Sequence, residues 1–144
     1  MNYYSKYTFF DFFINIESEV QYLIAIELAL LQSTSVKTFF YMNSYAFYLY
    51  KMNDEFRLAI QSADFLIPDG QSIVWAVKTL YKRKINKVVF TYSFNPHISN
   101  ILSKHNAKVF FLGGTENELI NAINKIKMLN PNLSIAGYHN GFFC

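Results

Sequence analysis

Two short segments combine chemically useful side chains with glycine. The first is IPDG at residues 67–70, which follows a strand-like run and precedes a helix-like one. Ligands of open parallel sheets bind beyond the carboxyl ends of the strands, where loops lead into helix N-termini. Asp69 at such a strand end can act as a general base, and Gly70 lets a ligand approach the backbone. Alternatively, Asp69 only caps the following helix or orders the turn, because Pro-Asp-Gly is a favourable turn sequence anywhere.

The second segment is FLGGTENE at residues 111–118. A strand, the Gly113-Gly114 pair and a helix start at Thr115 can present free amides to a phosphate or pyrophosphate. The alternative is a tight strand-to-helix connection without a ligand, in which Thr115 and Glu118 form a capping box. The sequence contains neither GxGxxG nor GxxxxGK[ST], so neither a dinucleotide fingerprint nor an NTPase phosphate loop is indicated.

Other polar groups carry weaker signals. Five of the thirteen basic residues lie between Lys78 and Lys87, which suits contact with lipid headgroups or a diphosphate, or simply a solvated helix end. His97, His105 and His139 lack metal-ligand spacing with carboxylates or thiols. We therefore expect no metal and no other cofactor.

Alternating strand-like and helix-like segments must position these residues. Hydrophobic and β-branched runs predict strands over residues 6–16, 36–42, 64–67, 87–92, 107–112 and 133–137. Periodicity and capping residues predict helices that begin at Glu17, Asn53, Gln71, Pro96 and Thr115. The first helix is expected to bury Val20, Leu23, Ile24, Leu28 and Leu31 on one face. This alternation predicts an α/β fold with a mostly parallel, layered sheet.

Composition limits the class of protein. With 144 residues, 52% hydrophobic and 16% charged, the chain is expected to form one domain, residues 1–144, and not a disordered segment. A net charge of +3 is too small to indicate nucleic-acid binding. The only cysteine is Cys144, so a disulfide within the chain is excluded and a reducing cytoplasm is expected. Neither a transmembrane helix nor a signal peptide is expected.

Considered together, four blocks resemble the WecG/TagA/CpsF family of bacterial glycosyltransferases. They cover much of the chain from Lys37 to Phe143 and are FFYMN (39–43), SADFLIPDGQSIVWAVKTL (62–80), KVFFLGGTENEL (108–119) and NPNLSIAGYHNGFF (130–143). The resemblance implies a Rossmann-like fold. It also implies transfer of an N-acetylmannosamine-like sugar from a UDP-sugar to a polyprenyl-diphosphate-linked or saccharide acceptor, at the cytoplasmic membrane face.

The resemblance also implies roles for individual residues. Asp69 matches the catalytic base, and Asn43 matches an asparagine at a strand end near the active pocket. Gly113 and Gly114 match a turn that faces the nucleotide. With them, Gly70 and Thr115 complete the substrate-binding residues that we expect.

The sequence departs from the family pattern at several positions. Tyr41 replaces a threonine, and Phe90 and Tyr92 replace a glycine and an aspartate in the segment after Lys87. Family members continue past the position of Cys144 through a Gly-x-Pro-x-Gln-Glu motif, so the sheet is expected to be incomplete at the C-terminus. Two alternatives therefore stay open, an inactive remnant that keeps the fold and some nucleotide affinity, and an interaction domain of generic α/β type.

Overall fold

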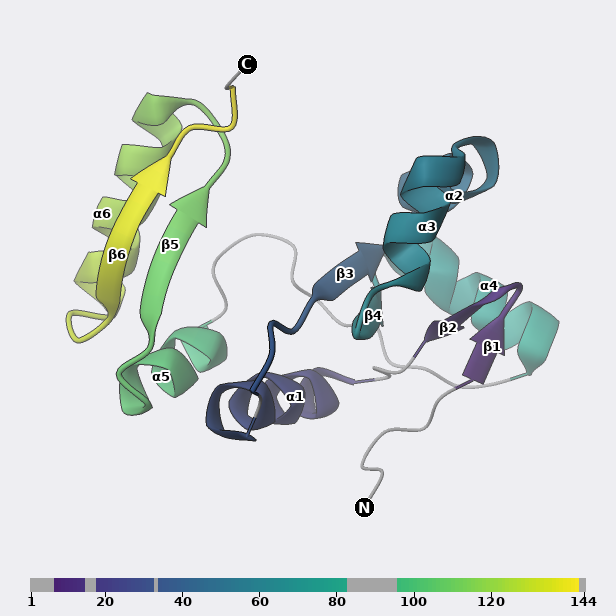
Figure 1. Cartoon of the computed structure of the whole chain (residues 1–144), viewed down its shortest axis with the longest axis horizontal. Helices are drawn as coiled ribbons and strands as arrows, with labels where there is room; N and C mark the ends of the chain where they lie inside the picture. Colours follow the sequence, from purple (N-terminus) through teal and green to yellow (C-terminus); the bar gives the residue numbers. More distant parts are fainter. Residues whose placement is uncertain (1–6, 15–17, 33, 83–95, 143–144) are drawn as a thin grey trace. The chain divides into compact units, whose positions relative to one another are not determined.

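A computed structural model describes residues 7–14, 18–32, 34–82 and 96–142 of the chain (Figure 1). They belong to two compact units, residues 1–91 and residues 92–144, and each unit is described by itself below. The prediction of a single domain stays a prediction.

The first unit begins with an antiparallel hairpin where the sequence predicted one strand. Strand β1 (Tyr7–Phe9) pairs with β2 (Phe12–Ile14), and Phe10 in the turn has a φ of 55°. A left-handed backbone is unusual for a bulky residue. Contacts from distant residues compensate here, because the Phe10 N–H donates to the Tyr81 hydroxyl (N···O 2.7 Å) and the Phe10 ring packs against another aromatic ring, that of Phe47.

Helix α1 (Glu19–Gln32) forms as predicted, but its buried face differs from the prediction. The buried residues are Tyr22 and Ala25, whereas Val20, Ile24 and Leu31 of the predicted face are exposed. The helix is apolar around most of its circumference, so periodicity could not select the buried side.

The centre of this unit is a parallel pair of strands, β3 (Phe39–Met42) and β4 (Phe65–Pro68). Two helices, α2 (Ser44–Met52) and α3 (Asp54–Gln61), connect them. Asparagine side chains cap both helices: Asn43 accepts from the Ala46 N–H and Asn53 from the Phe56 N–H, each at 2.8 Å. The sequence predicted the helix start at Asn53.

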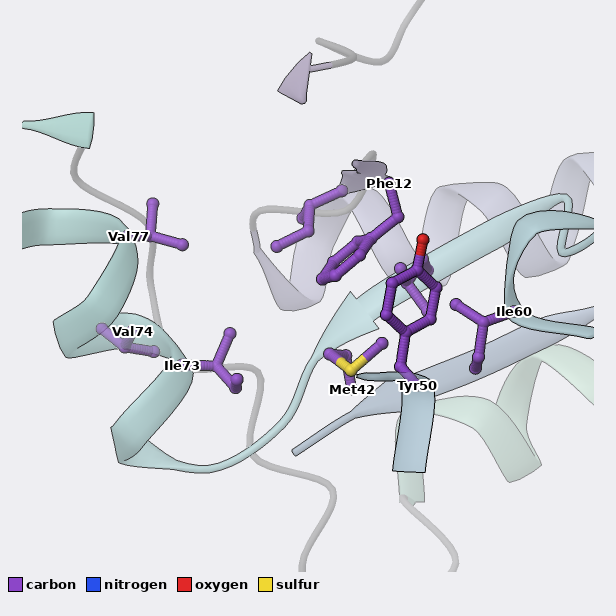
Figure 2. Packing of buried hydrophobic residues seen from close by; sticks show 9 residues of the cluster. Phe12, Met42, Tyr50, Ile60, Ile73, Val74 and Val77 are labelled. Atoms are coloured by element: carbon purple, nitrogen blue, oxygen red, sulfur yellow. The ribbon is translucent and has the colours of Figure 1, made fainter. Parts of the chain in front are cut away.

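The β3–β4 pair has two distinct faces, because side chains alternate along a strand. On one face, Met42 and Leu66 join a buried cluster with residues of the hairpin and of helices α2, α3 and α4 (Gln71–Tyr81). Figure 2 shows these side chains gathered around Met42 and Tyr50. The cluster consists of Phe12, Ile14, Met42, Tyr50, Ile60, Leu66, Ile73, Val74 and Val77.

The opposite face of the pair carries aromatic residues. The rings of Phe39 and Phe65 stack with their centroids 4.5 Å apart, and Tyr22 of α1 contacts the Phe39 ring edge-on at 5.7 Å. Helix α1 therefore packs against the face opposite the buried cluster.

The second unit contains helix α5 (Pro96–Lys104) and a strand-helix-strand segment. Strand β5 (Lys108–Leu112), helix α6 (Glu116–Leu129) and strand β6 (Ser134–His139) follow in order, and β5 and β6 pair in parallel. Pro96 occupies the first helical position, as predicted. Phe110 and Leu112, on one face of strand β5, are exposed among the described residues.

Both parallel pairs consist of strands joined by helices, so the prediction of an α/β fold is confirmed and the architecture is consistent with a Rossmann-like fold. The predicted strand over residues 87–92, with Phe90 and Tyr92, lies outside the described residues, as does the second half of the basic segment, residues 83–87.

Candidate active site

The carboxyl end of the β3–β4 pair brings Asn43 and Asp69 to one edge. The register pairs Met42 with Pro68, and the next residue of each strand is Asn43 or Asp69. The Asp69 N–H donates to the Met42 carbonyl oxygen (N···O 2.8 Å), which extends the ladder and fixes where the aspartate side chain begins. The backbone therefore places these two residues at the same edge of the strand pair.

Asp69 does not cap the following helix. The N-cap of α4 is Gly70, which has a φ of 79° and provides no side chain for capping. Only glycine adopts this conformation without strain, so the sequence places it where the strand turns sharply into the helix. The alternative in which Asp69 serves as a helix cap is therefore wrong.

The carboxylate of Asp69 is unusual in its surroundings. The residue is half-buried, and its Oδ1 atom is sealed from solvent with no hydrogen-bond partner among the described residues. Leaving a buried carboxylate oxygen without a donor costs free energy, so such atoms are rare and require an explanation, of which a catalytic role is one. Because Asp69 is half-buried and Oδ1 is sealed, a ligand can approach this carboxylate only from its accessible part.

The side-chain oxygen of Asn43 has a structural role, because it accepts a hydrogen bond from the Ala46 N–H at the start of helix α2. It is half-buried at the start of α2. The remaining NH₂ group of its side chain is the part that can donate to a ligand.

Two tyrosines lie on the aromatic face beside this strand end. The hydroxyls of Tyr22 and Tyr41 are hydrogen-bonded with an O···O distance of 2.7 Å. Burial and the partner hydroxyl raise the pKa of Tyr22. Burial also raises the pKa of Tyr41, and the negative charge of Asp69 raises it further, whereas the bond to Tyr22 lowers it. Sequence reasoning did not find Tyr22, because nothing in its local pattern distinguishes it from the other residues of α1.

In the second unit, Gly113 and Gly114 form the predicted break between strand β5 and helix α6. The φ angles of Gly113 and Gly114 are 136° and 65°, and Thr115 with Glu118 forms the predicted capping box at the start of α6. The Thr115 N–H donates to the Glu118 carboxylate (N···O 2.9 Å), and the Gly113 N–H donates to the His139 carbonyl oxygen (3.2 Å). Two of the three amides that were expected to face a diphosphate are therefore engaged within the protein.

The capping box also sets the charge at this helix start. Hydrogen bonds from the Thr115 hydroxyl and amide lower the pKa of the Glu118 carboxyl group, which is therefore negative at neutral pH. The N-terminus of a helix favours negative charge. At the start of α6 this charge is supplied by Glu118 of the protein itself.

Gly141 is a second residue that sequence reasoning missed. Its N–H donates to the Gly114 carbonyl oxygen (2.9 Å), and a Cβ atom at this position would lie 3.1 Å from the Gly113 Cα. The lack of a side chain at Gly141 allows the two backbone segments to touch. The need for glycine at position 141 follows only from its contact with Gly113 and Gly114, which are distant in sequence.

A separate cavity of about 270 Å³ lies at the opposite end of strand β4 from Asp69. Its walls include Asp64, which directly precedes β4, and the buried side chains of Phe12, Ile60 and Leu66. Asp11 and Gln61 also line the cavity, which therefore has both polar and apolar walls. Its two carboxylates are paired, Asp64 with Lys37 (2.8 Å) and Asp11 with Lys51 (3.0 Å).

Within the part of the chain that the structure describes, no helix is both long and apolar enough to cross a bilayer. Nor do three or more His, Cys, Asp or Glu side chains of these residues gather as a metal ion would require.

A sequence profile described as "Glycosyl transferase WecG/TagA/CpsF family" matches residues 8–144. The chain belongs to this family. Among its curated relatives are two enzymes called N-acetylglucosaminyldiphosphoundecaprenol N-acetyl-beta-D-mannosaminyltransferase. The one from Bacillus spizizenii is 27% identical over 90 residues, which are 62% of this chain and 35% of the relative. The one from Bacillus subtilis is 26% identical over 97 residues, or 67% of this chain and 37% of the relative.

The matched segments span little more than a third of the length of these relatives. Asp69 and Asn43 belong to the first unit, whereas Gly113, Gly114 and Thr115 belong to the second. The expectation that all of them face one cleft stays a prediction.

Proposed function

We propose that this protein transfers an N-acetylmannosamine-like sugar from a UDP-sugar to a saccharide acceptor carried on a polyprenyl diphosphate. The family and the names of the two relatives, which act on a diphosphoundecaprenol-linked N-acetylglucosamine, support this choice of substrates. A lipid-linked acceptor would bring the protein to the cytoplasmic face of a membrane as a peripheral enzyme.

The observation that carries the proposal is the Asp69 carboxylate at the carboxyl end of β4, with one sealed oxygen that lacks a donor among the described residues. In the proposed reaction, Asp69 takes the proton of an acceptor hydroxyl. The acceptor oxygen attacks the anomeric carbon with inversion, the bond from that carbon to the phosphate oxygen breaks, and UDP leaves with the electron pair.

The other expected site residues support this step in the proposal. Asn43 donates its NH₂ group to a substrate oxygen, and Gly70 leaves room beside Asp69 for the sugar. Gly113, Gly114 and Thr115 form the turn near the donor diphosphate, where the Gly114 N–H is the amide that we propose as its donor.

The test is transfer by Asp69→Asn, which keeps the side-chain shape and removes the base. Formation of the glycosylated lipid and release of UDP are measured together, with a UDP-sugar and an N-acetylglucosamine diphosphate on a short polyprenyl chain. Removing a general base should lower kcat by about 100- to 10,000-fold. The matched control is Asp54→Asn, an exposed carboxylate paired with Arg57 on α3, which should keep the parent rate. Unchanged turnover in Asp69→Asn would exclude this role.

The second candidate is a protein that keeps the family fold without transferring a sugar. The observation that favours this candidate is the capping box. The Thr115 amide and hydroxyl donate to the Glu118 carboxylate and therefore do not donate to a diphosphate. Titration of the chain with UDP and with UDP-sugars separates the two candidates. Binding with turnover supports the enzyme, and binding without turnover supports the second candidate.

A further inference from the structure

The hydrogen-bonded pair Tyr22 and Tyr41 lies on the same face of the sheet as the proposed base. Tyr41 pairs in register with Ile67, two residues before Asp69. Because strand side chains alternate, positions 41, 67 and 69 project to one face. The effect of the Asp69 charge on the pKa of Tyr41 is consistent with this placement.

Tyr22, on helix α1, contacts Tyr41 of strand β3 through a hydrogen bond between the two hydroxyls. Its side chain is only 5% exposed, its ring contacts Phe39 edge-on, and its hydroxyl bonds to that of Tyr41. A buried hydroxyl requires a partner, so Tyr22 restrains the Tyr41 ring in one orientation. Tyr41 itself is 39% exposed, so a ligand can reach part of this residue.

We propose that Tyr41 binds the acceptor sugar beside Asp69 and that Tyr22 is a positioning residue that acts through Tyr41. The inference rests on the proposed function and adds the residues that orient its acceptor. A pyranose has an apolar C–H face and polar edges, which suit the flat ring and the hydroxyl of a restrained tyrosine. With the sugar against Tyr41, one of its hydroxyl groups can reach the neighbouring carboxylate.

A purely structural pair would behave differently. If the bond between Tyr22 and Tyr41 served only the packing of α1 on the strands, its loss would lower stability and leave ligand affinity unchanged. The two cases are therefore separated by measuring both quantities in the same variants.

The experiment compares Tyr22→Phe, Tyr41→Phe and Tyr41→Ala in the full chain. Calorimetry gives the affinity for N-acetylglucosamine diphosphate on a short polyprenyl chain and for a UDP-sugar, and thermal unfolding gives the stability. The control is Tyr48→Phe, an exposed tyrosine on α2 whose ring stacks on Tyr45.

Tyr22→Phe should weaken acceptor binding about fivefold, the effect of losing one hydrogen bond, without changing affinity for the UDP-sugar. Tyr41→Phe should have a similar effect, and Tyr41→Ala a larger one because it also removes the ring. Tyr48→Phe should bind as the parent does.

Two results overturn the inference: unchanged acceptor affinity in Tyr22→Phe and Tyr41→Ala, or no acceptor binding by the parent chain. These results are distinct from failure of the proposed base. If acceptor affinity depends on the tyrosines while Asp69→Asn turns over normally, the inference stands and the role of Asp69 fails. If Asp69→Asn abolishes transfer and the tyrosine variants bind normally, the reverse holds.

Discussion

The amino end of the β3–β4 pair depends on one carboxylate, that of Asp64. Its Oδ2 atom accepts hydrogen bonds from the Thr38 N–H and hydroxyl, both at 3.0 Å, and its Oδ1 atom pairs with Lys37 at 2.8 Å. Asp64 thus joins the start of β4 to the residue that precedes β3. We expect Asp64→Ala to destabilise the first unit.

The magnitude follows from these contacts. A hydrogen bond to a charged group contributes about 1.5–3 kcal/mol, and a pair as exposed as Lys37–Asp64 contributes about 0.2–1 kcal/mol. Because the Asp64 side chain is 31% exposed, the lower part of the range applies, and the free energy of unfolding should fall by about 2 kcal/mol. Urea unfolding at pH 7 measures this fall in the free energy of unfolding. Asp54→Ala, which removes an exposed carboxylate paired with Arg57, is the control and should cost less than about 0.5 kcal/mol.

The pH dependence provides a second check. Hydrogen bonds from Lys37 and from the Thr38 backbone lower the folded-state pKa of Asp64. The resulting stability is complete above the unfolded-state pKa, about 3.9, and is lost as the pH falls through the lower folded-state pKa. The difference in stability between the parent and Asp64→Asn should therefore shrink in acid. Equal losses in Asp64→Ala and Asp54→Ala would refute the reasoning. So would a stability difference between the parent and Asp64→Asn that does not shrink as the pH falls.

Two further predictions concern the loops at the strand ends. Asn43→Ala removes the cap of α2 and should lower the free energy of unfolding by about 1 kcal/mol in urea, whereas Asn43→Asp keeps an acceptor and should stay close to the parent; equal losses would argue against capping. Gly141→Ala forces a Cβ against Gly113 and should cost about 1–2 kcal/mol in the same assay; a stability equal to that of the parent would mean that the turn gives way without strain.

The helix starts were predictable because their signals are local. Asn53 and the Thr115–Glu118 box act within three residues of themselves, and the structure confirms both caps. The hairpin at Phe10 was not predictable, since its left-handed backbone is stabilised by Tyr81 and Phe47, which are distant in sequence.

In the candidate site, too, features with a local sequence signal were predicted, and features that depend on residues distant in sequence were not. The Pro-Asp-Gly turn placed Asp69 at a strand end, which the structure confirms, and the strand register brings it beside Asn43. Tyr22 and Gly141 escaped detection because each is defined by a partner 19 or more residues away, Tyr41 for the first and Gly113 for the second. Local patterns therefore located the loops but not the side chains that fix them.

The connectivity of the two parallel pairs bears on how the polypeptide acquires its structure during synthesis. In each pair, the partner strands are separated by nothing more than the helical connection between them, as Figure 1 shows for β3 with β4 and for β5 with β6. Short sequence separation makes loop closure inexpensive in entropy and favours rapid nucleation. A nascent chain emerging from the ribosome should therefore protect the β3–β4 ladder from hydrogen exchange before β6 has been translated.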